Sequence, residues 1–238
     1  MAIIEWEKDE TVAIMTLNNG ENRHNPEFIK AILNAFDEIE QVEATTALII
    51  ASSSEKYWSL GIDLEWITGA FNNQDFESIK EFMYGLNKMF TRALLFPLPV
   101  IAAINGHTFG DGSMLACACD FRFMKTGRGY FCFPEVDISI PFVPSMLETI
   151  RKSIPHYYME ELILTGKKAG AQELEEHRVV LKACENDEEL MRESLVYART
   201  FNKKRSIFAE HKKRMHRFIF EVMESEDPKY IDSLNLMA

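Results

Sequence analysis

The sequence contains no long hydrophobic run and no recognisable targeting signal. None of its apolar runs approaches the ~20 residues needed to span a bilayer, so we expect no membrane segment. Its first residues lack the basic and then apolar pattern of a secretion signal, and residues 235–238 form neither a peroxisomal nor a retention tripeptide. We therefore expect a cytoplasmic protein with no membrane partner.

Cysteine is scarce, and the common metal and serine-hydrolase motifs are missing. Two of the four cysteines, Cys117 and Cys119, would point about 200° apart on a helix, which is a poor start for a shared metal. We predict that the cysteines are buried, reduced thiols. The six histidines show no H-E-x-x-H spacing, and no serine stands in a G-x-S-x-G turn. We expect no metal and disfavour a serine hydrolase.

Positive charge is in deficit. The 26 Lys and Arg residues face 37 Asp and Glu residues, and the net charge of −11 argues against a nucleic-acid partner. One segment departs from this balance, because residues 201–220 carry seven basic residues and a single acidic one, Glu210. This segment is either a solvated helix face or a patch for a phosphate-bearing ligand, on the same subunit or on a neighbour.

Short apolar runs alternate with helical patterns along the 238 residues. Residues 2–7 and 11–17 predict a hairpin, and a loop is predicted over 52–63. Continuous apolar runs predict buried strands at 47–51, 100–104 and 121–124, with a further strand-like run at 178–181. Helices are predicted from Pro26, over 75–96, up to Ala118, and through most of the chain after 155. The alternation indicates an α/β fold.

Residues 104–113 are the most informative stretch. A predicted strand ends at Ile104, three glycines follow within residues 106–112, and an apolar helical run begins at Met114. Glycine allows a tight turn or a close approach of the backbone to a ligand. The first N–H groups of a helix that begins there lack partners and suit an oxyanion or a phosphate. A plain connection between strand and helix is the alternative.

Several segments, in order along the chain, share one pattern of motifs. Residues 57–64 (YWSLGIDL) match F-S-A-G-x-D-L, and residues 105–112 (NGHTFGDG) with 118–122 (ACDFR) match N-G-x-A-x-G-G-G and A-C-D-x-R. Residues 133–141 (FPEVDISIP) are close to F-x-x-P-E-x-x-x-G-x-x-P, and residues 22–26 (NRHNP) stand at the position of an entry loop. The ordered set resembles the crotonase superfamily, the enoyl-CoA hydratase/isomerase fold.

The resemblance implies a crotonase-type ββα spiral, an α/β fold, with a helical C-terminal part. Members bind acyl-CoA thioesters and are usually trimers or dimers of trimers. We therefore expect an acyl-CoA substrate, a homotrimer or dimer of trimers, and no cofactor beyond the CoA of the substrate. Residues 1–195 would form the catalytic core, and residues 196–238 a helical segment for trimerisation or for covering CoA.

The resemblance also implies roles for individual residues. Two backbone N–H groups polarise the thioester carbonyl in this family, and the matching positions are Ile62 and Asp111. Asp111 replaces the usual glycine, and its carboxylate either turns away to support the helix start or acts as a second catalytic carboxylate. Expected contacts to substrate or CoA are Arg23, His24, Pro26, Ser59, Leu60, Gly61, Asp63 and Gly110.

The number of glutamates decides the expected reaction. Hydratases of the family use two, and in this sequence the first position is Met114 while the second is Glu135. A single carboxylate can take a proton from C2 of a 3-enoyl-CoA and return it at C4, a pattern similar to 3,2-enoyl-CoA isomerases. We predict such an isomerase, with the pKa of Glu135 raised by an apolar pocket of Phe133, Val136, Ile138 and Met114.

Other readings of the same site stay open. A hydratase, a decarboxylase or a thioesterase would use the same fold, and a non-catalytic acyl-CoA-binding protein is a further alternative. We expect an internal ion pair between Asp120 and Arg122, and Asp137 on a strand facing away from Glu135. His107 is either catalytic, or it lines the pocket or pairs with the backbone. Candidate aromatic residues for the acyl pocket are Trp66, Phe71, Phe82 and Phe142.

Overall fold

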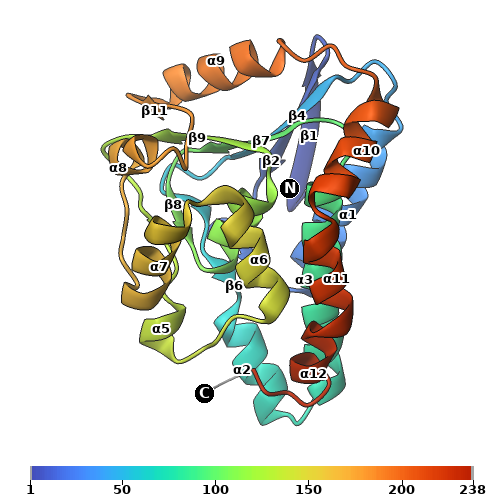
Figure 1. Ribbon diagram of the computed structural model, residues 1–238, viewed down its shortest axis with the longest axis vertical. Coiled ribbons are helices and arrows are strands. Elements are labelled where there is room, and N and C mark those ends of the chain that lie inside the picture. Colours follow the sequence, from blue (N-terminus) through green and yellow to red (C-terminus); the bar gives the residue numbers. More distant parts are fainter. Residues whose placement is uncertain (1, 237–238) are drawn as a thin grey trace.

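The computed structural model describes residues 2–236 and contains a six-stranded sheet in the order β1-β2-β4-β7-β9-β11 (Figure 1). Strands β1 and β2 are antiparallel, and all the other neighbours in this sheet are parallel. The strands are β1 (Ile4–Asp9), β2 (Val12–Leu17), β4 (Ala47–Ser52), β7 (Val100–Ile104), β9 (Phe121–Lys125) and β11 (Ala183–Cys184).

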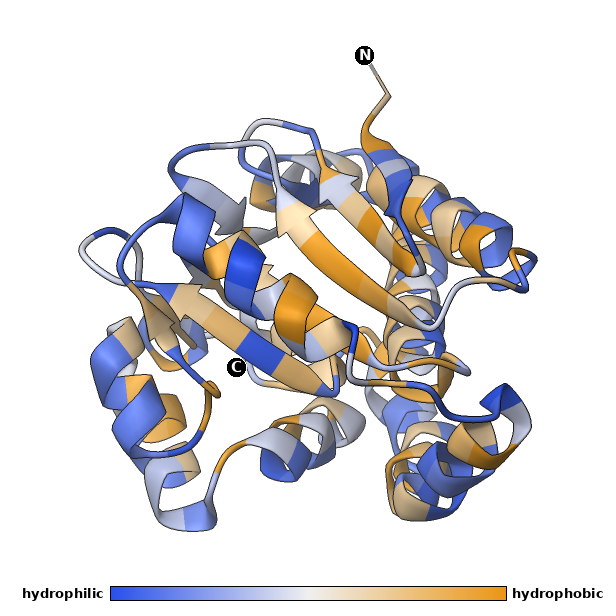
Figure 2. Cartoon of the chain, turned by 90° about the horizontal axis from the view of Figure 1, so that it is seen from above, coloured by the Kyte–Doolittle hydropathy of each residue, from blue (hydrophilic) through white to orange (hydrophobic). Residues whose placement is uncertain are grey.

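The large sheet is covered on both faces, which explains its continuous apolar strands. One face, with Ile49, Ile101 and Phe123, packs against helix α9 (Asp187–Ala198). The other face belongs to the main core, and Figure 2 shows hydrophobic residues concentrated along these strands. The predicted hairpin and the strands at 47–51, 100–104 and 121–124 are confirmed, with a two-residue turn that starts at Glu10.

Two small sheets replace the predicted loop over residues 52–63, so that prediction is wrong. Strands β5 (Tyr57–Ser59), β8 (His107–Phe109) and β10 (Phe131–Cys132) form one sheet, and β3 (Arg23–His24) pairs with β6 (Gly61–Ile62) in the other. Strands of two or three residues are too short to show an alternating pattern, and their pairing with distant partners defines them. They bring residues around 24, 61 and 109 together.

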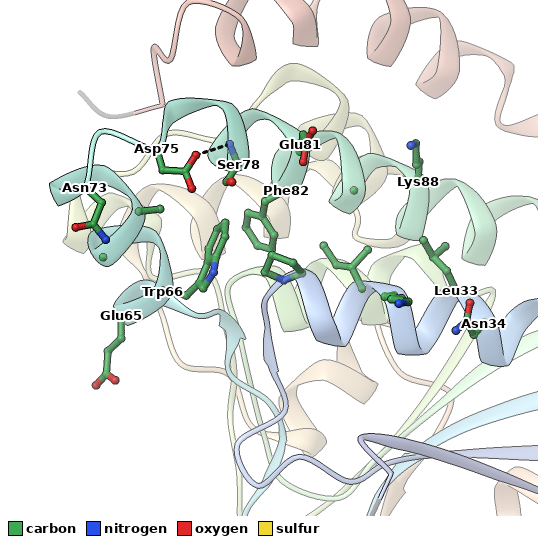
Figure 3. Close-up of a pocket in the computed structure, with 16 residues that line it drawn as sticks. Leu33, Asn34, Glu65, Trp66, Asn73, Asp75, Ser78, Glu81, Phe82 and Lys88 are labelled. Atoms are coloured by element: carbon green, nitrogen blue, oxygen red, sulfur yellow. Dashed lines mark hydrogen bonds between the residues drawn. The ribbon is translucent and has the colours of Figure 1, made fainter.

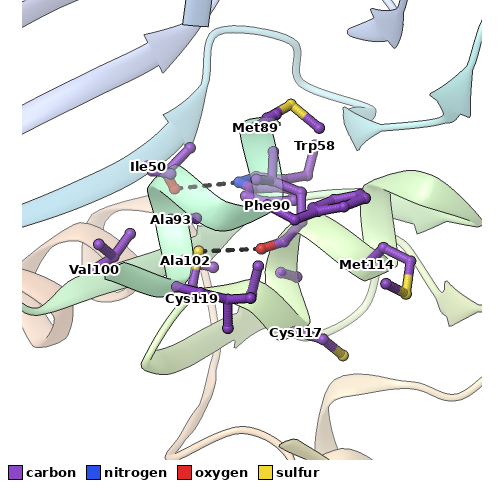
Figure 4. Packing of buried hydrophobic residues seen from close by; sticks show 14 of the residues in the cluster. Ile50, Trp58, Met89, Phe90, Ala93, Val100, Ala102, Met114, Cys117 and Cys119 are labelled. Carbon is purple, nitrogen blue, oxygen red and sulfur yellow. Dashed lines mark hydrogen bonds between the residues drawn. The ribbon is translucent and has the colours of Figure 1, made fainter. Parts of the chain in front are cut away.

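The helices between the strands begin and end where the sequence provides caps. The side chains of Asn25, Asp63 and Asp75 accept hydrogen bonds from the first turns of α1 (Pro26–Glu40), α2 (Leu64–Asn72) and α3 (Phe76–Leu95). Every residue of α4 (Asp111–Ala118) is buried, as expected for a helix that is apolar on all sides. Figure 4 shows Met114 and Cys117 of α4 in the core near Trp58 and Phe90.

The chain after residue 134 is mainly helical, which confirms the prediction made for the part after residue 155. It contains α5 (Glu135–Ile138), α6 (Pro144–Ser153), α7 (His156–Thr165), α8 (Ala171–Glu176), α9, α10 (Arg205–Met215), α11 (Arg217–Ser225) and α12 (Asp227–Ile231). Helices α10 to α12 run alongside α3, and α11 also packs against α6 (Figure 1). The predicted strand at 178–181 is wrong, because the N–H groups of Val179 and Val180 close a turn on the carbonyl of Leu174.

Two charged residues near β9 have other partners than predicted. Asp120 accepts hydrogen bonds from Lys212 Nζ (2.8 Å) and from the backbone N–H of Val100 (2.8 Å). Arg122 donates to three backbone carbonyls, including that of Val179. The expected Asp120–Arg122 ion pair is therefore wrong, because Asp120 pairs with Lys212 and the guanidinium of Arg122 donates to backbone carbonyls.

The basic segment of residues 201–220 is divided between structural and exposed side chains. Lys212 is buried in its ion pair with Asp120, and Arg205 donates to the carbonyls of Glu40, Val42 and Thr45 at and beyond the end of α1. These contacts attach α10 to the core.

The four cysteines are free and buried, as predicted. In the part of the chain that the structure describes, no helix has the length and apolar character to cross a membrane.

Candidate active site

The backbone of Gly61 in β6 lies directly against the start of α4. Gly61 has a φ of +73°, and a Cβ built there would stand 2.7 Å from both the backbone nitrogen of Asp111 and the carbonyl oxygen of Phe109. Only glycine permits this approach. The two predicted N–H positions, Ile62 and Asp111, are therefore brought to one place from segments about 50 residues apart.

Both of these N–H groups point away from the chain's own hydrogen-bond ladders. Asp111 is the first residue of α4, and the first N–H groups of a helix have no acceptor within it. Ile62 lies opposite His24 in the parallel pair, and the carbonyl of His24 accepts from Asp63 N–H at 2.9 Å. Successive N–H groups along a strand point in opposite directions, so the N–H of Ile62 points away from β3. The arrangement suits an oxygen that carries negative charge.

The carboxyl group of Glu135 lies next to this pair of N–H groups. A Cβ built on Gly110 would be 3.1 Å from Glu135 Oε1, which places the carboxyl beside the turn that starts α4. Glu135 Oε2 is buried and has no hydrogen-bond partner among the described residues. Burial raises the pKa of Glu135 to about 8, its own backbone N–H works against this rise, and the nearby negative charge of Asp111 adds to it.

The surroundings of Glu135 differ in part from those predicted. Phe133 and Met114 are fully buried, as expected of a pocket wall. Val136 and Ile138 are 51% and 42% exposed, so their predicted place in that wall is wrong. The reason is that residues 135–138 form the short helix α5, which turns these side chains outward, and not the expected strand. Asp137 is exposed, also from this helix.

Asp111 is buried and has partners within the protein. Its Oδ2 contacts His24 Nδ1 at 2.5 Å, and His24 Nε2 lies 3.0 Å from Ser59 Oγ. The His24 ring stacks on Phe28 with ring centroids 4.6 Å apart. Its side chain thus bonds to His24, and Asp111 is the acidic residue in the first turn of α4. His24 and Ser59 have no exposed surface, and this burial places them behind the site instead of on its surface.

The other predicted contacts lie around the same turn. Asp63 caps α2 and accepts a hydrogen bond from Asn25 Nδ2 at 3.3 Å. Arg23 pairs with Glu21 at 2.7 Å, and its side chain stays 36% exposed. The backbone N–H of Leu60 donates to the carbonyl of Glu21. Arg23 is thus the predicted contact that keeps a charged group available to a ligand in solution.

A cleft of about 790 Å³ opens between α1, α2 and α3 (Figure 3). Trp66 and Phe82 lie side by side in it, with ring centroids 4.9 Å apart, and Pro26 lines one end. Two of the four candidate aromatic residues are therefore in this cleft. Phe71 lies outside and packs on Phe76. Phe142 packs on Phe133, on the Glu135 side.

His107 lies among other aromatic rings. Its ring packs against Tyr57, Phe109 and Tyr130, with centroid distances of 6.0, 5.3 and 5.8 Å. Burial lowers the pKa of His107, and nearby positive charges, first that of Lys56, lower it further. A neutral ring in this setting fits the lining role better than a catalytic one.

Comparison with known proteins gives consistent matches over most of the chain. The family model for enoyl-CoA hydratase/isomerase matches residues 7–231. The chain is 32% identical over 193 residues to enoyl-CoA delta isomerase 2, peroxisomal, of Arabidopsis thaliana, covering 77% of this chain and 78% of that protein. It is 28% identical over 186 residues to a short-chain-enoyl-CoA hydratase of Clostridium acetobutylicum, covering 76% and 69%.

The fold has close counterparts among solved structures. An enoyl-CoA hydratase/isomerase family protein from Pseudomonas syringae superposes with a TM-score of 0.87 over 97% of both chains, at 20% sequence identity. Likeness at this identity shows a common fold. The two sequence relatives are named for different reactions, isomerisation in one and hydration in the other.

Proposed function

Since this chain belongs to the enoyl-CoA hydratase/isomerase family, we propose that it moves the double bond of an enoyl-CoA thioester from position 3 to position 2. Glu135 is the single acid–base group in this proposal. The observation that carries it is the position of the Glu135 carboxyl, with Oε2 buried and a pKa raised to about 8, beside the first turn of α4. A carboxyl with a pKa near the working pH can both take and return a proton.

The proposed reaction is a proton transfer in two steps. The ionised carboxylate of Glu135 takes a proton from C2, and the electron pair of that C–H bond moves into the thioester carbonyl, which becomes a dienolate. The backbone N–H groups of Ile62 and Asp111 hold the dienolate oxygen, and each such donor is typically worth about 2.7–4 kcal/mol. Protonated Glu135 then delivers the same proton to C4. Atoms and charge balance with CoA as part of the substrate and no further cofactor.

Two residues favour isomerisation over hydration. Addition of water needs a second group that holds the water molecule, and Met114, at the position where the family's hydratases carry a glutamate, cannot transfer a proton. The second carboxyl group near the site is that of Asp111, which raises the pKa of Glu135. Its oxygen is already hydrogen-bonded to His24, so it is not free to hold that water molecule. The similarity to a delta isomerase supports the same choice. Hydration is the second candidate, favoured by the similarity to a short-chain hydratase.

We also propose that the chain assembles as a homotrimer or a dimer of trimers in the cytoplasm. Met215 and Phe218, on α10 and α11, are 73% and 58% exposed, although α10 is firmly attached to the core through Lys212. Large exposed apolar side chains on a fixed element are typical of contacts between subunits. The molar mass measured by light scattering would decide between a monomer and these assemblies.

The experiment for the reaction uses 3-hexenoyl-CoA and the ultraviolet absorbance of the conjugated product. We expect absorbance to rise with the wild-type protein, and Glu135→Gln to lower the rate at least about 100-fold while circular dichroism stays unchanged. Asp137→Asn, an exposed carboxyl two residues further along α5, is the matched control and should keep full activity. A folded and active Glu135→Gln protein would reject Glu135 as the acid–base group. Faster turnover of a 2-enoyl-CoA to its hydrated product would favour the hydratase.

A further inference from the structure

His24 and Asp111 form a hydrogen-bonded pair in the interior, directly behind the N-terminus of α4. His24 has no exposed surface and Asp111 is 5% exposed, so neither side chain reaches a substrate. The distance of 2.5 Å between His24 Nδ1 and Asp111 Oδ2 requires a proton between these two atoms, because two lone pairs would repel each other. A buried carboxylate at this position needs an explanation, since Asp111 also carries one of the N–H groups of the proposed site.

The position of every proton in this group follows from the acceptors around Ser59. The carbonyl oxygen of Asn22 lies 2.7 Å from Ser59 Oγ and can only accept, so the Ser59 hydroxyl donates to it. Ser59 Oγ therefore accepts from its other neighbours, which are Gly61 N–H at 3.1 Å and His24 Nε2 at 3.0 Å. His24 Nε2 must carry a proton. With a second proton between Nδ1 and the Asp111 carboxyl, the pair as a whole is electrically neutral.

We infer that His24 is a positioning residue that neutralises the Asp111 carboxylate, and that this neutralisation makes a carboxylate tolerable where the dienolate oxygen would bind. The inference rests on the proposed function. Without the imidazole, Asp111 would present an uncompensated negative charge, in a poorly solvated place, to the dienolate oxygen and to ionised Glu135. The charges on the dienolate oxygen and on Glu135 both take part in the proton transfer, so repulsion by Asp111 would slow the chemical step.

The kinetic test is a double-mutant cycle of His24→Leu, Asp111→Asn and the two combined. We expect His24→Leu to lower kcat on the order of 10- to 100-fold with little change in KM, because the lost interaction acts on the transition state. Asp111→Asn should lower kcat less than His24→Leu does, because it removes the charge and keeps the shape. The double variant should be more active than His24→Leu, although it carries one more substitution.

A purely structural role of His24 gives the opposite order. If the ring only fills space beside Phe28, the double variant will be as impaired as His24→Leu or worse, and that result would overturn the inference. His216→Leu is the matched control, since His216 is also a buried histidine (4% exposed) and lies in the Lys152, Asp120 and Lys212 cluster away from the site. It should lower stability and leave kcat unchanged in the folded protein.

A second measurement does not depend on turnover. In ¹⁵N-labelled wild-type protein, a proton between His24 Nδ1 and Asp111 should give a strongly deshielded NMR resonance that couples to imidazole nitrogen and disappears in Asp111→Asn. Absence of this resonance overturns the shared proton. If the resonance is present and the wild type fails to turn over 3-hexenoyl-CoA, the pair stands and the proposed reaction fails.

Discussion

Replacing Glu135 by glutamine should stabilise the fold, and increasingly so as the pH rises. Burial raises the pKa of the folded carboxyl from its usual 4.5 to about 8, whereas the unfolded chain keeps the usual value. Below pH 4.5 both states hold the proton, and Glu135 contributes no penalty. Between pH 4.5 and 8 the native state holds a proton that the unfolded state has lost, so stability falls as the pH rises. Glutamine does not ionise and has no such loss.

The size of this effect follows from the shift. Each pH unit between the two pKa values costs about 1.4 kcal/mol, so the full interval costs at most about 5 kcal/mol. The exposed residues of α5 (Val136, Asp137 and Ile138) allow local opening, which admits water to the carboxylate and relieves part of the cost. We therefore expect a difference of about 2–5 kcal/mol in the free energy of unfolding above pH 8.

Urea unfolding of both proteins at pH 5, 6.5 and 8.5 measures this difference. The free energies should be similar at pH 5 and diverge at higher pH, with the glutamine variant the more stable. Glu5→Gln, an exposed carboxyl on β1, is the control and should follow the wild type at every pH. The kcat/KM of the wild type should rise over the same range, because the base must be ionised. Parallel stability curves for wild type and Glu135→Gln would refute the buried, protonated carboxyl.

Two further predictions concern the backbone contact at the site and the attachment of the C-terminal helices. Gly61→Ala should abolish turnover and lower stability by about 1–3 kcal/mol from the positive φ alone, whereas Gly170→Ala, with open space around it, should leave kcat unchanged in the same assay. Lys212→Ala should cost about 3 kcal/mol because it leaves the largely buried Asp120 carboxylate without its cation, whereas Lys213→Ala, exposed on the same helix, should leave the unfolding midpoint unchanged.

The long elements of the fold were predictable because each carries its own signal. Helix α3 has twenty residues with one apolar face and an aspartate cap, and β7 is an unbroken apolar run between Pro99 and the glycine turn. The short strands β5, β6 and β8 carry no such signal, since two or three residues cannot show a period. Helix α2 was not predicted, although its cap, Asp63, is a signal for a helix start that the sequence contains.

The site divides in a similar way. Glu135 and the N–H positions at Ile62 and Asp111 stand in continuous motifs, so they could be proposed from the sequence, and the fold brings them together. The contact between His24 and Asp111 joins residues 87 positions apart, and neither residue type indicates such a partner. The outward turn of Val136 and Ile138 was also out of reach, because four residues that include Val and Ile favour a strand by propensity and became a helical turn through their surroundings.

The backbone groups at the two ends of α4 differ in their hydrogen bonding. At its C-terminal end, the carbonyls of Ala116, Cys117 and Cys119 accept hydrogen bonds from Arg122 and Lys152. At its N-terminal end, the N–H of Asp111 has no acceptor among the described residues, although the helix is buried along its whole length. The first N–H groups of a helix have no acceptor within it, so the N–H of Asp111 is available to an acceptor from outside the helix. This availability supports the proposed binding of the dienolate oxygen at Asp111. It also explains why the carboxylate of the same residue must be neutralised from behind.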